Sequence, residues 1–193
     1  MGRPKLLLPY GGNTVLGTLV ASLRVAGVSP IVLVASADDA EVRDWCMAAG
    51  SMTVALNPAP ERGMLSSILE GVATLGGAGT LARGGAPLLI CPGDLPALRP
   101  DTVVELLARR QVAAAGLAVP AWRGKRGHPL AIAPALIPEI PHLDPSRGLR
   151  QLLDLHPDDL LTVEVDDPGC VRDLDTPEDY QRLLAGEGNQ PRG

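Results

Sequence analysis

The chain has 193 residues, 46% of them hydrophobic, which suits one domain with a sizeable core. It contains no Phe, so that core has to be built from aliphatic side chains. A net charge of −5 argues against a nucleic-acid binder, and the three widely spaced cysteines argue against a zinc knuckle or a disulfide framework. No apolar stretch approaches the ~20 residues of a membrane helix, and a reducing, cytoplasmic setting is the default expectation.

The chain begins with a basic segment of the kind that holds phosphate. Residues 2–12 carry Arg3 and Lys5, followed by an apolar run and a Gly-Gly turn. Such loops lie between a buried strand and a helix, where backbone N–H groups and the helix dipole favour an anion. A helix-like pattern follows over residues 15–26, but no strand precedes. The sequence therefore predicts the second half of a phosphate site.

Short apolar runs then alternate with helix-like segments. Strands are expected over residues 31–35, 52–56 and 87–91, and helices over 38–49, 64–75 and 100–110. The Gly-rich stretch 76–85 predicts a surface loop. Continuous apolar strands separated by helices favour βαβ units and a mostly parallel sheet that is covered on both faces.

The later part of the chain is less regular. Strands are expected over residues 112–119 and 130–133, with a polar connection over 122–129 between them. A helix over 147–155, a strand over 161–165 and a closing helix over 177–184 follow. Residues 186–193 are predicted to be a disordered tail. The sequence thus predicts one domain over residues 1–185.

Asp94 directly follows the third buried strand, in the sequence Cys91-Pro92-Gly93-Asp94-Leu95-Pro96. In open α/β sheets ligands gather outside the carboxyl ends of strands, so Asp94 would project into the crevice. A single carboxylate is what Mg²⁺ commonly takes from a protein, while phosphates and waters fill its other positions. The alternative is that Asp94 merely caps a turn.

A second acidic cluster precedes the closing helix. Thr176 predicts the N-cap of that helix, with Pro at the first helical position and acidic residues in the first turn. Asp173 and Asp175 lie two positions apart, so both would point to one side of an extended segment. One of them could complete a metal site with Asp94.

Gly63, Ser66 and Ser67 lie where a strand ends and a helix begins. Gly63 would allow close approach to the backbone, and the serines lie near a helix N-terminus, which suits the polar edge of a ligand. Ordinary capping by serine explains the same residues, and alone it is the preferred interpretation.

The connection over residues 123–129 is basic and Gly-rich, and it contains Arg126 and His128. Because Arg recognises phosphate with a bidentate fork, this segment could clamp an anionic second substrate. It could equally be a solvated hairpin.

In this order, the segments resemble the MobA-like nucleotidyltransferases, and most closely their molybdenum cofactor cytidylyltransferase branch. The resemblance covers nearly the whole chain, to about residue 184. It rests on Gly2-Arg3-Pro4-Lys5-Leu6-Leu7-Leu8-Pro9, Asn57-Pro58 with Gly63-Met64-Leu65-Ser66-Ser67, Gly93-Asp94-Leu95-Pro96, Arg126-Gly127-His128-Pro129 and Asp173-Leu174-Asp175-Thr176-Pro177-Glu178-Asp179-Tyr180.

The resemblance implies a Rossmann-like, three-layer α/β sandwich of the nucleotide-diphospho-sugar transferase type. It implies transfer of CMP from CTP to the phosphate of the molybdopterin cofactor with release of pyrophosphate, and a molybdoenzyme or maturation protein as a further partner. The roles that it implies are the following: Arg3 and Lys5 hold the triphosphate, Gly63, Ser66 and Ser67 lie by the base, Asp94 binds Mg²⁺ with Asp173 as second ligand, and Arg126 and His128 face the acceptor.

One departure from the family concerns the start of the chain. Family members open with a strand and a Gly-rich turn before the Gly-Arg-Pro-Lys run, and here Met1 stands where that turn should end. The first strand is therefore expected to be missing, together with backbone donors to the triphosphate, which puts activity in doubt. Alternatives are a guanylyl- or sugar-phosphate nucleotidyltransferase and a non-catalytic protein that holds the cofactor.

Overall fold

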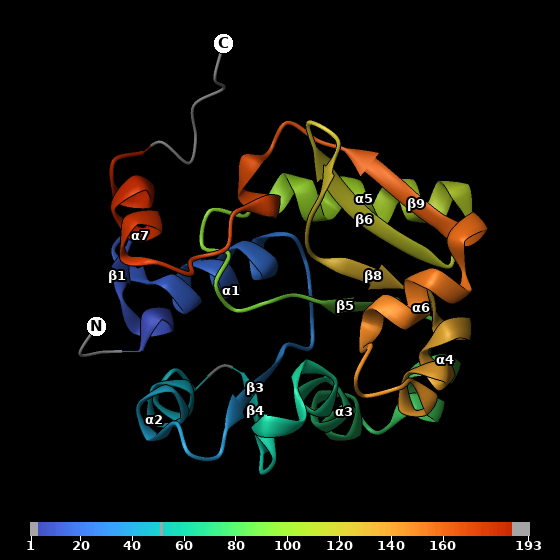
Figure 1. Ribbon diagram of the computed structural model, residues 1–193, viewed down its shortest axis with the longest axis horizontal. Coiled ribbons are helices and arrows are strands. Elements are labelled where there is room, and N and C mark those ends of the chain that lie inside the picture. Colours follow the sequence, from blue (N-terminus) through green and yellow to red (C-terminus); the bar gives the residue numbers. More distant parts are fainter. Residues whose placement is uncertain (1–3, 51, 187–193) are drawn as a thin grey trace.

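The alternating apolar runs and helices form an α/β fold around a central sheet (Figure 1). The structure is a computed structural model that describes residues 4–50 and 52–186. Arg3 and residues 187–193 of the expected tail lie outside the described residues. Within the described part, no helix is both long and apolar enough to cross a membrane.

The first half of the chain contains helices and parallel strands close to those predicted. After the short helix η1 (Lys5–Leu7) come β1 (Pro9–Tyr10), β2 (Asn13–Thr14), α1 (Val15–Val25), β3 (Val32–Ser36), α2 (Ala40–Ala48), β4 (Thr53–Asn57), η2 (Pro60–Arg62) and α3 (Met64–Thr74). β3 and β4 pair in parallel, with α2 as their crossover. This arrangement confirms the βαβ unit that the sequence predicts.

The second half builds a five-stranded sheet from β5 (Leu88–Ile90), β6 (Leu117–Trp122), β7 (Lys125–Arg126), β8 (Leu130–Ile132) and β9 (Leu160–Glu164). β8 is antiparallel to both β5 and β6, whereas β9 is parallel to β6. β5, β6 and β9 therefore run in one direction, and their carboxyl ends share an edge. The expected mostly parallel sheet is partly mixed, because the connection after β6 is a hairpin that returns the chain without a crossover.

Two sequence predictions in this half are wrong. Residues 76–85 form helix α4 (Ala78–Gly84) rather than a loop, because positive-φ glycines flank the helix while Leu81 packs on the core. The strand expected over 112–119 begins only at Leu117, since α5 (Pro100–Ala113) continues until Ala114 ends it at φ +52°. In both cases the pattern of apolar residues was compatible with either type of element.

The core lies on both faces of the five-stranded sheet. On one face α1 and α5 pack against β6 and β9 through Leu19, Val103, Leu106, Ala118 and Val163. On the other, α3, η3 (Pro134–His142) and α6 (Leu149–Leu155) pack on β6 and β8 through Ile68, Leu117, Ile132, Ile137 and Leu152. Leu117 and Ala118 are neighbours in β6 that point to opposite faces, so the fold has three layers.

Within the described residues the sheet is interrupted between β3 and β5. The β3–β4 pair and the five-stranded sheet are separate ladders. Each residue of β5 is only partly buried, whereas all three residues of β8 are buried. β5 therefore has a strand partner on one side only.

The last helix, α7 (Pro177–Leu184), closes the fold beside the start of the chain (Figure 1). Thr176 is its N-cap, as predicted, and forms a capping box with Asp179. The hydroxyl of Tyr180 donates a hydrogen bond to the carbonyl of Pro9 at 2.7 Å. This bond fastens α7 to the segment that carries Lys5.

Candidate functional site

Three connections meet at the edge formed by the carboxyl ends of β5, β6 and β9. They are residues 91–99, 122–129 and 165–176. The amide of Leu174 donates to the carbonyl of Asp94 at 3.1 Å, and the amide of His128 donates to the carbonyl of Cys170 at 2.8 Å. The backbone itself therefore brings the Asp94 segment, the basic hairpin and the second acidic cluster together, at the edge where α/β sheets bind ligands.

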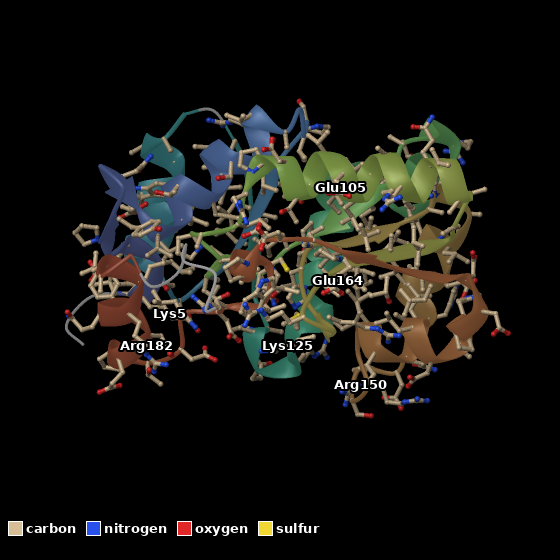
Figure 2. The ribbon with its side chains drawn as sticks, turned by 90° about the horizontal axis from the view of Figure 1, so that it is seen from above. Lys5, Glu105, Lys125, Arg150, Glu164 and Arg182 are labelled. Atoms are coloured by element: carbon tan, nitrogen blue, oxygen red, sulfur yellow. The ribbon has the colours of Figure 1, made fainter. Side chains whose placement is uncertain are left out.

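Lys5 reaches this edge from the N-terminal segment. Its Nζ lies 2.7 Å from Oδ2 of Asp94 and 2.9 Å from Oδ1 of Asp175. Leu6 packs beside the Asp94 segment, because a Cβ placed on Gly93 would lie 3.5 Å from the Leu6 side chain. Figure 2 shows Lys5 on the same side of the molecule as Lys125, with Glu105 on the opposite side.

The carboxylate of Asp94 has one oxygen that remains unsatisfied. Only 16% of the side chain is exposed, and Oδ1 is buried without a hydrogen-bond partner. Such an oxygen costs free energy unless a ligand pairs with it. No group of three or more His, Cys, Asp or Glu side chains that could hold a metal lies within the described residues. The unpaired oxygen of Asp94 fits a cation that takes one carboxylate from the protein and its other ligands from phosphates and water.

The charges at this edge act on one another. Partial burial lowers the pKa of Lys5, but its hydrogen bonds to Asp94 and Asp175 and their negative charges together raise that pKa above its usual value. Lys5 is therefore an ammonium group at neutral pH. Desolvation lowers the pKa of His128, while the nearby charges of Asp94 and Asp173 act in the opposite direction. The role of Asp173 as a second metal ligand stays a prediction.

Asn57 organises the segment that contains Gly63, Ser66 and Ser67. It is 1% exposed, and its Nδ2 donates to Oγ of Ser66 at 2.8 Å and to Oγ of Ser67 at 2.9 Å. Its Oδ1 accepts from the amide of Ala59 at 2.9 Å. The helix α3 begins after Gly63, whose φ is +84° and which has no side chain to cap the first amides. The Ser66 hydroxyl donates to the carbonyl of Gly63 at 2.8 Å, so it does not act as an N-cap acceptor.

Backbone contacts hold the basic hairpin over residues 122–129 in place. The amide of Gly127 donates to the carbonyl of Pro120 at 2.8 Å, and a side chain on Gly127 would overlap the backbone of Cys170. Arg126 is exposed, and part of the surface of His128 is accessible to solvent. A turn at Arg123 (φ +52°) places its guanidinium 4.7 Å from the centroid of the Trp122 ring.

A surface hollow lies elsewhere, at the amino-terminal ends of β3 and β4. It has a volume of about 660 Å³ and is lined by Arg24, Val28, Ile31, Met52 and Thr53, among others. No carboxylate lines it within the described residues. We therefore place the candidate site at Asp94, where charged groups converge, rather than at this hollow.

The sequence interpretation gave no role to one residue of the site, Asn57, and left the role of a second, Asp175, open. Asn57 was part of a motif only, although a polar residue that ends an apolar strand and precedes Pro is a usable signal. Asp175 was one of two candidates, and its contact with Lys5 depends on the fold of α7 against the N-terminal segment. No local pattern could have revealed that contact.

Fold and site together define a protein of the nucleotidyltransferase class. Residues 1–160 match the MobA-like NTP transferase domain, and the chain belongs to that family. The resemblance read from the sequence is thereby confirmed at the level of the family.

The individual relatives differ in what their names say. The molybdenum cofactor cytidylyltransferase of Escherichia coli K12 is 24% identical over 93% of this chain and 86% of its own length. The nicotine blue oxidoreductase of Paenarthrobacter nicotinovorans is 30% identical over 95% and 90%. Among solved structures, Rv0371c from Mycobacterium tuberculosis H37Rv superposes with a TM-score of 0.74 at 26% identity, over 96% of this chain and 91% of that one. A manganese complex of the same protein gives a TM-score of 0.71 at 28% identity, over 95% and 93%.

Proposed function

We propose that this chain transfers CMP from CTP to the phosphate group of a molybdopterin-type acceptor and releases pyrophosphate. The observation that carries the proposal is the ammonium group of Lys5 beside a carboxylate whose second oxygen is buried and unpaired. The preference for CTP is supported by the relative from Escherichia coli and by the sequence of the N-terminal loop. The family as a whole acts on nucleoside triphosphates.

In this proposal the protein contributes position and charge. An oxygen of the acceptor phosphate attacks the α-phosphorus of CTP, and the bond from that phosphorus to the bridging oxygen of pyrophosphate breaks in line with the attack. Lys5, and Arg3 outside the described residues, hold the triphosphate, and Lys5 offsets the charge that spreads over its oxygens. Asp94, with Asp173 as second ligand, would hold a divalent cation such as Mg²⁺, which would supply Lewis-acid neutralisation of the phosphate oxygens.

The two substrates approach from different segments. Gly63, Ser66 and Ser67 face the cytosine base, in a geometry that Asn57 fixes. Arg126 and His128 of the basic hairpin face the acceptor, whose phosphate suits a guanidinium fork. The hydrogen bond from the His128 amide to the carbonyl of Cys170 supports a position of the hairpin beside the second acidic cluster.

The test is a pyrophosphate-release assay with CTP, a divalent cation and a molybdopterin-type acceptor. Asp94→Asn should lower kcat by about 10²-fold or more, as the loss of a positioned charge does in other enzymes. Asp101→Asn, on the exposed first turn of α5, is the matched control and should leave kcat unchanged. Turnover with GTP and not with CTP would move the chain to a guanylyl transferase, and full activity of Asp94→Asn would refute the proposed centre.

The relative at 30% identity favours a second candidate, an oxidoreductase. It is tested in a separate assay that contains nicotine blue and a reductant but no nucleoside triphosphate. Conversion under those conditions, with no pyrophosphate formed from CTP, would favour the oxidoreductase. Binding of the cofactor without either reaction would favour a non-catalytic carrier.

A further inference from the structure

The contact between Lys5 and Asp94 has a consequence for cation binding. Lys5 takes Oδ2 of Asp94 at 2.7 Å, while Oδ1 of the same carboxylate is buried and unpaired. Asp175, the second partner of Lys5, is far more exposed, with 62% of its side chain accessible against 16% for Asp94. The ammonium group is thus shared between a carboxylate that is enclosed and one that is open to solvent.

We propose that Lys5 and a divalent cation compete for Asp94, and that a bound triphosphate ends the competition by drawing the ammonium group onto its own oxygens. This inference rests on the proposed function, because it takes Asp94 as the cation ligand. It adds an order of binding: the cation enters the site together with the nucleotide, and the protein alone takes it up weakly.

Electrostatics gives the reason. A cation on Oδ1 would lie within a few ångströms of an ammonium group on Oδ2, and two positive charges at one partly buried carboxylate repel each other. An ammonium group carries three donors and no acceptor, so it exchanges one oxygen partner for another without leaving a donor unpaired. The triphosphate offers such oxygens with more negative charge than one carboxylate supplies.

Asp175 keeps the ammonium group of Lys5 in the site during this exchange. It contacts the same ammonium group at 2.9 Å, and it precedes α7, which Tyr180 fastens to the N-terminal segment. When Lys5 leaves Asp94, Asp175 still holds the ammonium group within the site. The ammonium group of Lys5 therefore moves by a change of side-chain rotamer, and the backbone of η1 keeps its position.

Binding of Mn²⁺ to the protein without nucleotide, measured by electron paramagnetic resonance, tests the competition directly. Lys5→Met should bind Mn²⁺ about fivefold more tightly than the unchanged protein, which corresponds to about 1 kcal/mol. Lys5→Gln should behave in the same way and serves as a second neutral variant. Lys125→Met is the matched control, because the Lys125 ammonium donates to the carbonyl of Val171 and does not contact Asp94; its affinity should not change. Equal or weaker binding of Mn²⁺ by both Lys5 variants would overturn the inference.

A second readout follows the movement itself. The chain has only two lysines, Lys5 and Lys125, so NMR of isotopically labelled lysine side chains gives one signal from the site and one reference. Saturation with Mg²⁺ should shift the signal of Lys5 and leave that of Lys125 in place. Binding of Mg²⁺ without a shift of Lys5 would contradict competition.

The proposed function fails in a different way. If Asp94→Asn binds Mn²⁺ and CTP together as tightly as the unchanged protein, Asp94 is not the cation ligand and the proposed centre is wrong. If Asp94→Asn loses that binding while the Lys5 variants gain none, the centre stands and only the competition is refuted.

Discussion

Replacing Asn57 with Ala should weaken both the fold and the nucleotide site. Asn57 is 1% exposed and makes three hydrogen bonds, to the side chains of Ser66 and Ser67 and from the amide of Ala59. Each such bond contributes about 1 kcal/mol net, so the free energy of unfolding should fall by about 3 kcal/mol. Stability differences of that size are a large part of the 5–15 kcal/mol that is typical of a domain, as an order of magnitude.

The same substitution should raise the KM for CTP about tenfold, because the loss of one positioning interaction of ~1.4 kcal/mol corresponds to that factor. The KM for the acceptor should change little, since the basic hairpin does not contact Asn57 in any described hydrogen bond. The assay is pyrophosphate release at varied CTP, combined with urea unfolding of the same protein.

Asn13→Ala is the matched control. Asn13 is exposed, and its side chain accepts a hydrogen bond from the neighbouring amide of Thr14. This variant should lose less than about 1 kcal/mol of stability and should keep its KM. If Asn57→Ala loses the expected stability while its KM for CTP stays the same, Asn57 supports only the fold, and the base does not lie at Ser66 and Ser67.

Three further outcomes follow from particular contacts. Gly127→Ala should destabilise by about 2 kcal/mol, because its Cβ would overlap the backbone of Cys170, whereas Gly84→Ala, which meets nothing within 4 Å, should stay within about 1 kcal/mol; thermal unfolding of both checks this. Burial raises the pKa of the Cys91 thiol to about 12, so very little thiolate is present at pH 8. Iodoacetamide should therefore label Cys91 in urea but not in the native protein. Rapid labelling of the native protein would contradict this burial. Desolvation lowers the pKa of His128 in the folded protein, so the unfolded chain binds a proton at a higher pH; the free energy of unfolding should be constant above about pH 6.5 and should fall as the pH drops through the folded pKa. The melting temperature of His128→Gln should therefore depend less on pH between pH 7.5 and 5 than that of the unchanged protein. An unchanged slope would refute the assignment.

Much of the fold could be predicted from the sequence, because the signals are local. α7 begins where Thr176 and the following Pro predict, and β3 and β4 lie within one residue of their apolar runs. The errors occur where composition is ambiguous. The glycines that flank α4 made its sequence typical of a loop. The antiparallel direction of β8 depends on the two-residue hairpin turn at Arg123 rather than on any pattern within the strand.

The site was predictable in part for a similar reason. The place of Asp94 after a buried strand follows from the general geometry of α/β sheets. Its contact with Lys5 joins residues 89 positions apart, and the contact of Lys5 with Asp175 joins residues 170 positions apart. The direct contact between Lys5 and Asp94 is determined by the packing of the N-terminal segment against α7 and the Asp94 segment.

The central claim is that Asp94 and Lys5 form a centre for nucleotidyl transfer. The most direct measurement follows CTP that is radiolabelled at its α-phosphate through one turnover with a divalent cation and a molybdopterin-type acceptor. We expect the label to appear in the acceptor with the unchanged protein, and to remain in CTP with Asp94→Asn. Label transfer by Asp94→Asn at the unchanged rate, or conversion of the acceptor without loss of CTP, would contradict the claim.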